Sequence, residues 1–175
     1  MRVLLVLTVL AAAVTRAEAQ DQRLVGRLDG TTLHSVSAYL DSSRAQGIPQ
    51  EPLVQKALEG ASKGATGDRI LAAVRNLGST MRAARQALGT ESTDREIIAG
   101  AAALRAGAAP DGLVNLRRAR GTTNLEVPLA VLADLVGLGV QVEAAYQSVL
   151  DLARTRAPDA DFIRLKEHRA ENQRP

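Results

Sequence analysis

The chain contains no cysteine and no tryptophan, and it has only two tyrosines, one phenylalanine and two histidines among 175 residues. Without cysteine, no disulfide can stabilise the fold, and lipid attachment to a thiol after a leader sequence is excluded. With so few aromatic side chains, the core must consist mainly of Leu, Val, Ile and Ala. There is also little on which sugar rings or unpaired bases can stack.

The scarcity of histidine bears on catalysis and metal binding. His34 and His168 lie near opposite ends of the chain, and neither belongs to a motif. Nucleophilic catalysis requires a base beside a Ser, Thr or Cys, and no Gly-x-Ser-x-Gly elbow is present. Zinc sites need His or Cys, and no acidic cluster has the spacing of a calcium loop. We therefore expect a protein that is not an enzyme and that holds no metal and no cofactor.

Paired carboxylates leave one catalytic alternative, a small hydrolase that acts on glycosidic bonds in the cell envelope. Each acidic candidate also has a structural explanation. Glu59 can pair with Lys63 four residues on, and others favour helix starts or polar helix faces. The candidates are Glu59, Glu91, Glu96, Asp134 and Glu143.

The first nineteen residues have the pattern of a secretory leader. Met1-Arg2 gives a positive start, the run 3–14 is apolar, and Ala17-Glu18-Ala19 is a small-x-small cleavage site. A run of about a dozen apolar residues is shorter than the roughly 20 that a bilayer-spanning helix requires. We expect cleavage before Gln20, no membrane span afterwards, and a periplasmic or extracellular location.

Removal of residues 1–19 from the 175 leaves 156 residues, enough for one domain. It also removes Arg2, Arg16 and Glu18, so 20 basic residues face 18 acidic ones. This near balance gives no overall steering toward nucleic acid, and no specific nucleic acid is expected as a partner. We expect a flexible segment over 20–30, a single all-helical domain over 31–166, and a polar tail over 167–175.

Apolar spacing predicts helices nearly everywhere and no strand. The clearest helix begins at Asp68, and its apolar positions recur in steps of four and three through Leu88. Gly78 interrupts this seam and is expected to bend the helix. Thr93 with Glu96 has the spacing of a capping box. Of the other expected helices, the first is capped by Thr31 or Thr32, and the second has Pro52 in its first turn. The rest begin at Asp111, near Pro128, shortly before Ala145, and at Pro158.

The connections between helices share a pattern. Gly47, Gly64, Gly107 and Gly139 each follow an apolar helix end, and an acidic residue comes four positions later. Glycine adopts the left-handed conformation that ends a helix, and the acid suits the positive end of the next one. The pattern predicts about seven to eight short antiparallel helices in an irregular bundle or degenerate array. Gly60, Gly64 and the alanine-rich segment around Gly100 are expected to allow close helix approach.

Two groups of basic side chains are candidates for binding. Arg75, Arg82 and Arg85 share the side of the third helix away from its apolar seam. A second group, Arg117, Arg118 and Arg120, precedes the loop 121–124. Arginine recognises phosphate and carboxylate through two parallel hydrogen bonds. An ordinary solvated surface is the alternative interpretation of both groups.

Three stretches resemble exported all-helical proteins of unassigned function from high-GC bacteria: PLVQKALEGASKG (52–64), RILAAVR (69–75) and VPLAVLADLV (127–136). The resemblance implies export and an all-helical fold, but no activity. We therefore expect a non-catalytic interaction or structural module of the cell envelope whose partner is an unknown protein or peptide. The carboxylate hydrolase and an arginine-based binder of anions or nucleic acid are the alternatives.

Overall fold

The computed structural model describes residues 21–171, so the predicted leader and its cleavage site lie outside this range. The helices are α1 (Gly30–Ala45), α2 (Glu51–Ser62), α3 (Gly67–Leu88), α4 (Asp94–Arg105), α5 (Pro110–Arg120), α6 (Glu126–Gly137), α7 (Val142–Arg154) and α8 (Asp159–Glu171). No strand occurs between residues 21 and 171, which confirms the all-α class. No helix in this range is both long and apolar enough to cross a bilayer.

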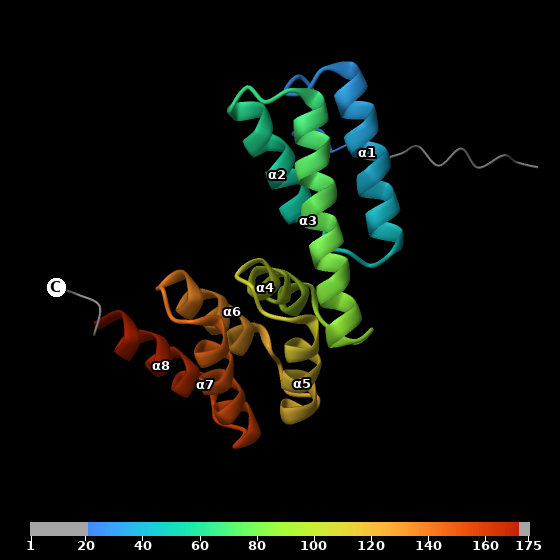
Figure 1. Cartoon of the computed structure of the whole chain (residues 1–175). Helices are drawn as coiled ribbons and strands as arrows, with labels where there is room; N and C mark the ends of the chain where they lie inside the picture. The colour runs from blue at the N-terminus through green and yellow to red at the C-terminus, as the bar shows by residue number, and fades with distance from the viewer. Residues whose placement is uncertain (1–20, 172–175) are drawn as a thin grey trace, which may run out of the picture.

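The helices form two layers. In one layer, α1 packs on α3, α3 on α5, and α5 on α7. In the other layer, α4 packs on α6, and α6 packs on α8. The long helix α3 also packs against α2 and α4, so it joins α1 and α2 to the rest of the molecule (Figure 1). The predicted array of short helices is therefore confirmed, with α3 as the shared element.

Left-handed residues end the helices where the sequence predicts them. Gly47, Gly64, Gly107 and Gly139 have φ between +64° and +108°. In each case the next residue donates its backbone N–H to the carbonyl five residues earlier, at 3.0 Å. This bond belongs to the Schellman arrangement, which satisfies a carbonyl at the helix end. A fifth joint follows α7, where Arg156 takes φ of 55° and Ala157 bonds to Leu152 at 3.0 Å.

Two predictions about helix starts have different outcomes. The capping box of α4 is confirmed: Thr93 accepts the N–H of Glu96, and Glu96 accepts the N–H of Thr93. The predicted cap of the first helix, Thr31 or Thr32, is wrong: α1 begins at Gly30 and is capped by Asp29, whose carboxylate accepts the N–H and the hydroxyl of Thr32. Thr32 is buried and so takes part in packing.

Glycines inside helices allow side chains to approach closely. A Cβ on Gly78 would lie 2.2 Å from the Tyr39 hydroxyl, so the tyrosine packs directly on the backbone of α3, which continues through Gly78. The bend expected there stays a prediction. Gly60 and Gly100 serve close approach as predicted, since a Cβ would lie 2.8 Å from Ile70 and 3.0 Å from Leu88. Gly64 differs: nothing lies within 4 Å of its Cβ position, so its role is the turn alone.

The ends of the domain are more extensive than predicted. Residues 21–29, expected to be flexible, form turns that bury Leu24 completely and Leu28 almost completely. These leucines are four residues apart, and both belong to the hydrophobic core. At the other end, α8 continues to Glu171 and so covers part of the segment expected to be a polar tail.

Candidate functional site

The six candidate arginines differ in exposure: Arg75 and Arg118 are exposed, Arg120 is buried, and the other three are half-buried. On α3, Arg75 is exposed, and Arg82 donates from Nε to the Gln46 side-chain oxygen at 2.6 Å. The Arg85 guanidinium lies against Gly47, 3.0 Å from where a Cβ would be. Arg82 and Arg85 therefore lie beside the joint between α1 and α2.

Arg117 is a connector between elements. Its Nε donates to the carbonyl of Leu88 at 3.3 Å, at the end of α3. One terminal nitrogen donates to the carbonyls of Gly121 and Thr123, each at 3.2 Å, and the other donates to Glu96 at 2.6 Å. These carbonyls lie at or beyond the negative ends of α3 and α5, where a cation is favourable. Most of the guanidinium's donors are thus used inside the protein.

Glu96 is the anion that faces Arg117. It is 3% exposed, and besides the capping bond it accepts the backbone N–H of Leu125 at 2.9 Å. Burial by itself raises the pKa of Glu96, but the hydrogen bonds from Thr93, Arg117 and Leu125 outweigh it and hold the pKa below its ordinary value. This carboxylate is a fixed negative charge and is poorly suited to donate a proton.

The Glu96–Arg117 pair forms one wall of a pocket of about 400 Å³. The remaining lining comes mainly from the loops that follow α3 and α5, including Gly89, Glu91, Gly121 and Asn124. Glu91 is exposed. The pocket brings together two acids and one arginine that the sequence singles out, but Glu96 and Arg117 are already engaged with each other.

The other two arginines of this group point in different directions. Arg120 is 5% exposed; it donates to the Ala157 carbonyl at 2.8 Å and to Asp159 at 3.0 Å, and its guanidinium lies 5.1 Å from the Phe162 ring centre. It fixes α5 to the joint between α7 and α8. Arg118 is exposed and donates to Asn115 at 3.3 Å. Anion binding by these residues stays a prediction, for which Arg75 and Arg118 are exposed and Arg82 and Arg85 are half-buried.

The remaining acidic candidates lie on different helices with separate partners. Glu59 pairs with Lys63 at 2.5 Å, as predicted, and also with Lys56. The hydrogen bond from Lys56 is the largest cause, and that from Lys63 the next, of a pKa of Glu59 lowered to about 2. Asp134 pairs with Lys166 across α6 and α8 at 3.2 Å, and Glu143 accepts from Gln147 on α7.

The histidines and acids do not form a metal-binding group. His34 is exposed on α1, and His168 is exposed on α8. Within residues 21–171, no group of three or more His, Cys, Asp or Glu side chains is placed to hold a metal ion.

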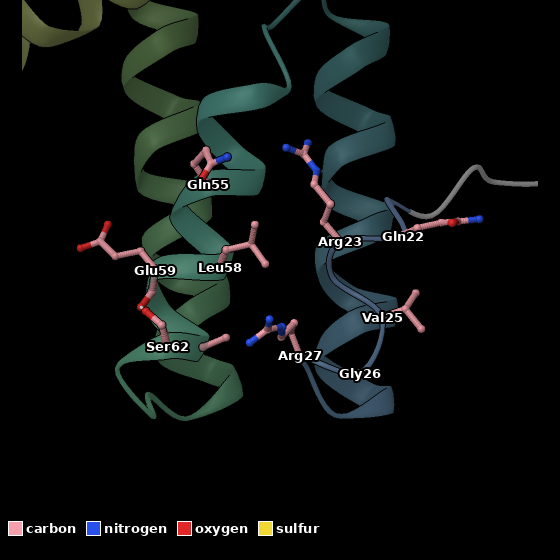
Figure 2. Close-up of a pocket in the computed structure, with 10 residues that line it drawn as sticks. Gln22, Arg23, Val25, Gly26, Arg27, Gln55, Leu58, Glu59 and Ser62 are labelled. Carbon is pink, nitrogen blue, oxygen red and sulfur yellow. Dashed lines mark hydrogen bonds between the residues drawn. The ribbon is translucent and has the colours of Figure 1, made fainter.

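A groove that the sequence did not predict lies between the N-terminal segment and α2 (Figure 2). Its volume is about 860 Å³, and Val25, Leu58 and Ala61 contribute apolar surface. Polar side chains complete the lining: Gln22, Arg23, Arg27, Gln55, Glu59 and Ser62. The signal that could have indicated this groove is the spacing of Leu24 and Leu28, which packs residues 21–29 on the domain.

Most charges at the groove are neutralised within the protein. Arg23 makes ion pairs with Asp21 at 2.7 Å and with Glu51 at 2.8 Å. The hydrogen bond from Arg23 lowers the pKa of Glu51 to about 2. Glu59 is paired with its two lysines, whereas exposed Arg27 has no ion pair within residues 21–171. The groove therefore presents one unpaired cation beside apolar surface.

No protein family model matches the chain, and the searches of curated proteins and of solved structures also find no match.

Proposed function

We propose that the chain is an exported, non-catalytic helical protein of the cell envelope that binds an extended segment of another protein in the groove between residues 22–27 and α2. The leader pattern and the resemblance to exported helical proteins support export. The volume of about 860 Å³ is within the range typical of ligand sites, roughly 300–1,000 Å³. The groove is the observation that carries the binding role.

The lining indicates the chemistry of the bound segment. Leu58 and Ala61 offer apolar contact, and Gln22, Gln55 and Ser62 offer hydrogen bonds at the edge. Arg27 is the cation without an internal partner, so a carboxylate beside an apolar residue is the complementary ligand group. Arg23 and Glu59 already have opposite charges beside them, and they shape the walls.

A pulldown with two matched variants tests the proposal. The chain without residues 1–19 is immobilised and exposed to envelope extract, and the retained proteins are compared with those retained by Val25→Glu and Ile163→Glu. Val25 lines the groove and is 54% exposed, whereas Ile163 on α8 is 41% exposed, so both carboxylates enter at accessible positions. We expect a retained protein to be lost with Val25→Glu and kept with Ile163→Glu. Retention that is equal in both variants, or no retention by the unchanged chain, contradicts the proposal.

Binding of anions through α3 is a second candidate. Arg75, Arg82 and Arg85 have no ion pair within residues 21–171, although Arg82 hydrogen-bonds Gln46. Binding of fluorescent polyphosphate should then weaken steeply as salt rises, because neutralised phosphates release counterions. A Gln substitution at Arg75 should weaken it further, and binding that does not depend on salt rules this candidate out.

A further inference from the structure

Four buried side-chain atoms within residues 21–171 have no hydrogen-bond partner: Ser37 Oγ, Ser43 Oγ, Gln50 Oε1 and Arg120 Nε. Polar atoms buried without a partner are costly, so proteins usually satisfy them with ordered water when no protein group is in reach. Ser37 lies on α1 and Gln50 caps the start of α2, and both residues line the same small cavity. Two of the four residues that carry these atoms therefore line one cavity.

The cavity lies between α1, the start of α2 and the N-terminal segment. Its volume is about 30 Å³, and it is lined by Asp21, Ser37, Leu40, Asp41, Arg44, Gln50 and Val54. A water molecule needs roughly 10–15 Å³ of such space and two to four polar partners. The cavity meets the first requirement, and its polar lining meets the second.

The orientation of the Gln50 amide defines what the cavity needs. Its Nε2 donates to the Ile48 carbonyl at 2.6 Å, and a flipped amide would place two oxygens against each other. Gln50 Oε1 is therefore an acceptor that only a donor or a cation can satisfy. Ser37 is 4% exposed, and its hydroxyl can donate to an oxygen in the cavity.

We propose that this cavity binds one ordered water molecule that accepts a hydrogen bond from Ser37 and donates one to Gln50 Oε1. Asp21 and Asp41 also line the cavity and can accept the water's second hydrogen, because their carboxylates have lone pairs beyond those used by Arg23 and Arg44. Arg44 is also among the lining residues, and its positive charge favours a neutral molecule over a cation.

The water links three elements that otherwise have few polar contacts. It joins α1 to α2 and lies beside Asp21, whose partner Arg23 is paired with Glu51 in the first turn of α2. It therefore contributes to the position of residues 21–23, which begin one wall of the groove. The water site does not depend on what the groove binds.

Ser43 supplies a matched control on the same helix. Its hydroxyl is also buried and without a partner, but Ser43 does not line the cavity. Ser37→Ala removes a partner of the water, whereas Ser43→Ala removes a hydroxyl outside this cavity. We expect Ser37→Ala to lower the folded-to-unfolded ratio by about fivefold, the loss of one hydrogen bond, and Ser43→Ala to leave it unchanged or higher.

The test combines a high-resolution crystal structure of the chain without residues 1–19 with urea unfolding of both variants. The expected density is one peak about 2.7–3.2 Å from both Ser37 Oγ and Gln50 Oε1. A cavity without density overturns the proposal, and so do equal unfolding effects of the two alanine variants. A peak with shorter contacts of about 2.4 Å, together with stabilisation by calcium chloride in a thermal-shift assay, assigns the site to a cation instead.

Discussion

At the residue scale, Arg117 shows how a basic side chain in a candidate binding motif serves the fold. We predict that Arg117→Met lowers the free energy of unfolding by about 3 kcal/mol, because Glu96 is left buried without its cation. The carbonyls of Leu88, Gly121 and Thr123 also lose their donor. Urea unfolding measures the loss. Arg118→Met is the control, since Arg118 is exposed and should change stability by less than about 0.5 kcal/mol. An effect of Arg117→Met as small as that of the control would contradict this role.

The same contact predicts a dependence of stability on pH. The pKa of Glu96 lies below its ordinary value of 4.5 in the folded chain, so the folded state favours the ionised form. This stabilisation is fully present well above pH 4.5, and it is lost as the pH falls from there through the lower folded pKa. We expect the free energy of unfolding to fall with acid in this window and to fall less steeply in Glu96→Gln. If Glu96→Gln keeps the slope of the unchanged chain, Glu96 is not its source.

Tyr39 and Gly78 give a prediction for a pair of residues. Gly78→Ala should lower the free energy of unfolding by about 2 kcal/mol, within the range for overpacking, because its Cβ would meet the Tyr39 hydroxyl. Tyr39→Phe removes that oxygen, so the double variant should be destabilised less than the sum of the two single variants. A double-mutant cycle from chemical unfolding measures the difference. Strict additivity would show that the tyrosine moves aside without cost.

At the element scale, glycines at helix ends allow two effects to be compared: the strain of a left-handed backbone and the space available for a Cβ atom. We predict that Gly64→Ala and Gly139→Ala each cost about 1 kcal/mol, because both glycines have positive φ while nothing lies within 4 Å of the added Cβ. Gly137→Ala is the control: this glycine has open space but a helical backbone, and alanine there should stabilise by up to about 1 kcal/mol. Thermal unfolding of the three variants measures the contrast, and the same sign in all three would contradict the explanation.

The helix ends also show which element boundaries could be predicted from the sequence. Four glycines with an acid four residues later located four helix ends correctly, because glycine is the residue that left-handed backbone favours. The joint after α7 has the same backbone hydrogen bond but escaped this pattern, since Arg156 occupies the left-handed position. The capping box of α4 was equally predictable because it depends on two side chains three residues apart. The role of Tyr39 was not, because Gly78 and its partner are far apart in the sequence.

At the scale of the whole molecule, helical class and helix number follow from local spacing, but the layers do not. The contacts of α1 with α3 and of α4 with α6 join helices that are not consecutive, and periodicity within one helix carries no information about them. The groove was missed for the same reason, since its walls come from residues 22–27 and 55–62. The sequence was sufficient to identify the arginines as candidate anion-binding groups. That Arg117 and Arg120 point into the protein could be seen only in the folded structure.

The position of α3 between the two parts of the array predicts one cooperative unfolding transition. Helices α1 and α2 pack on α3, and so do α4 and α5, so the loss of one side exposes the apolar seam of α3 to water. We expect Leu132→Ala on α6, where the leucine is fully buried, to lower the free energy of unfolding by about 3 kcal/mol. The free energy of opening measured by hydrogen exchange for the slowest amides in α1 and α2 should fall by the same amount, although these helices lie at the other end of the chain. Acceleration confined to α4–α8 would show that the array unfolds in parts, as repeat proteins can when each unit contacts only its neighbours.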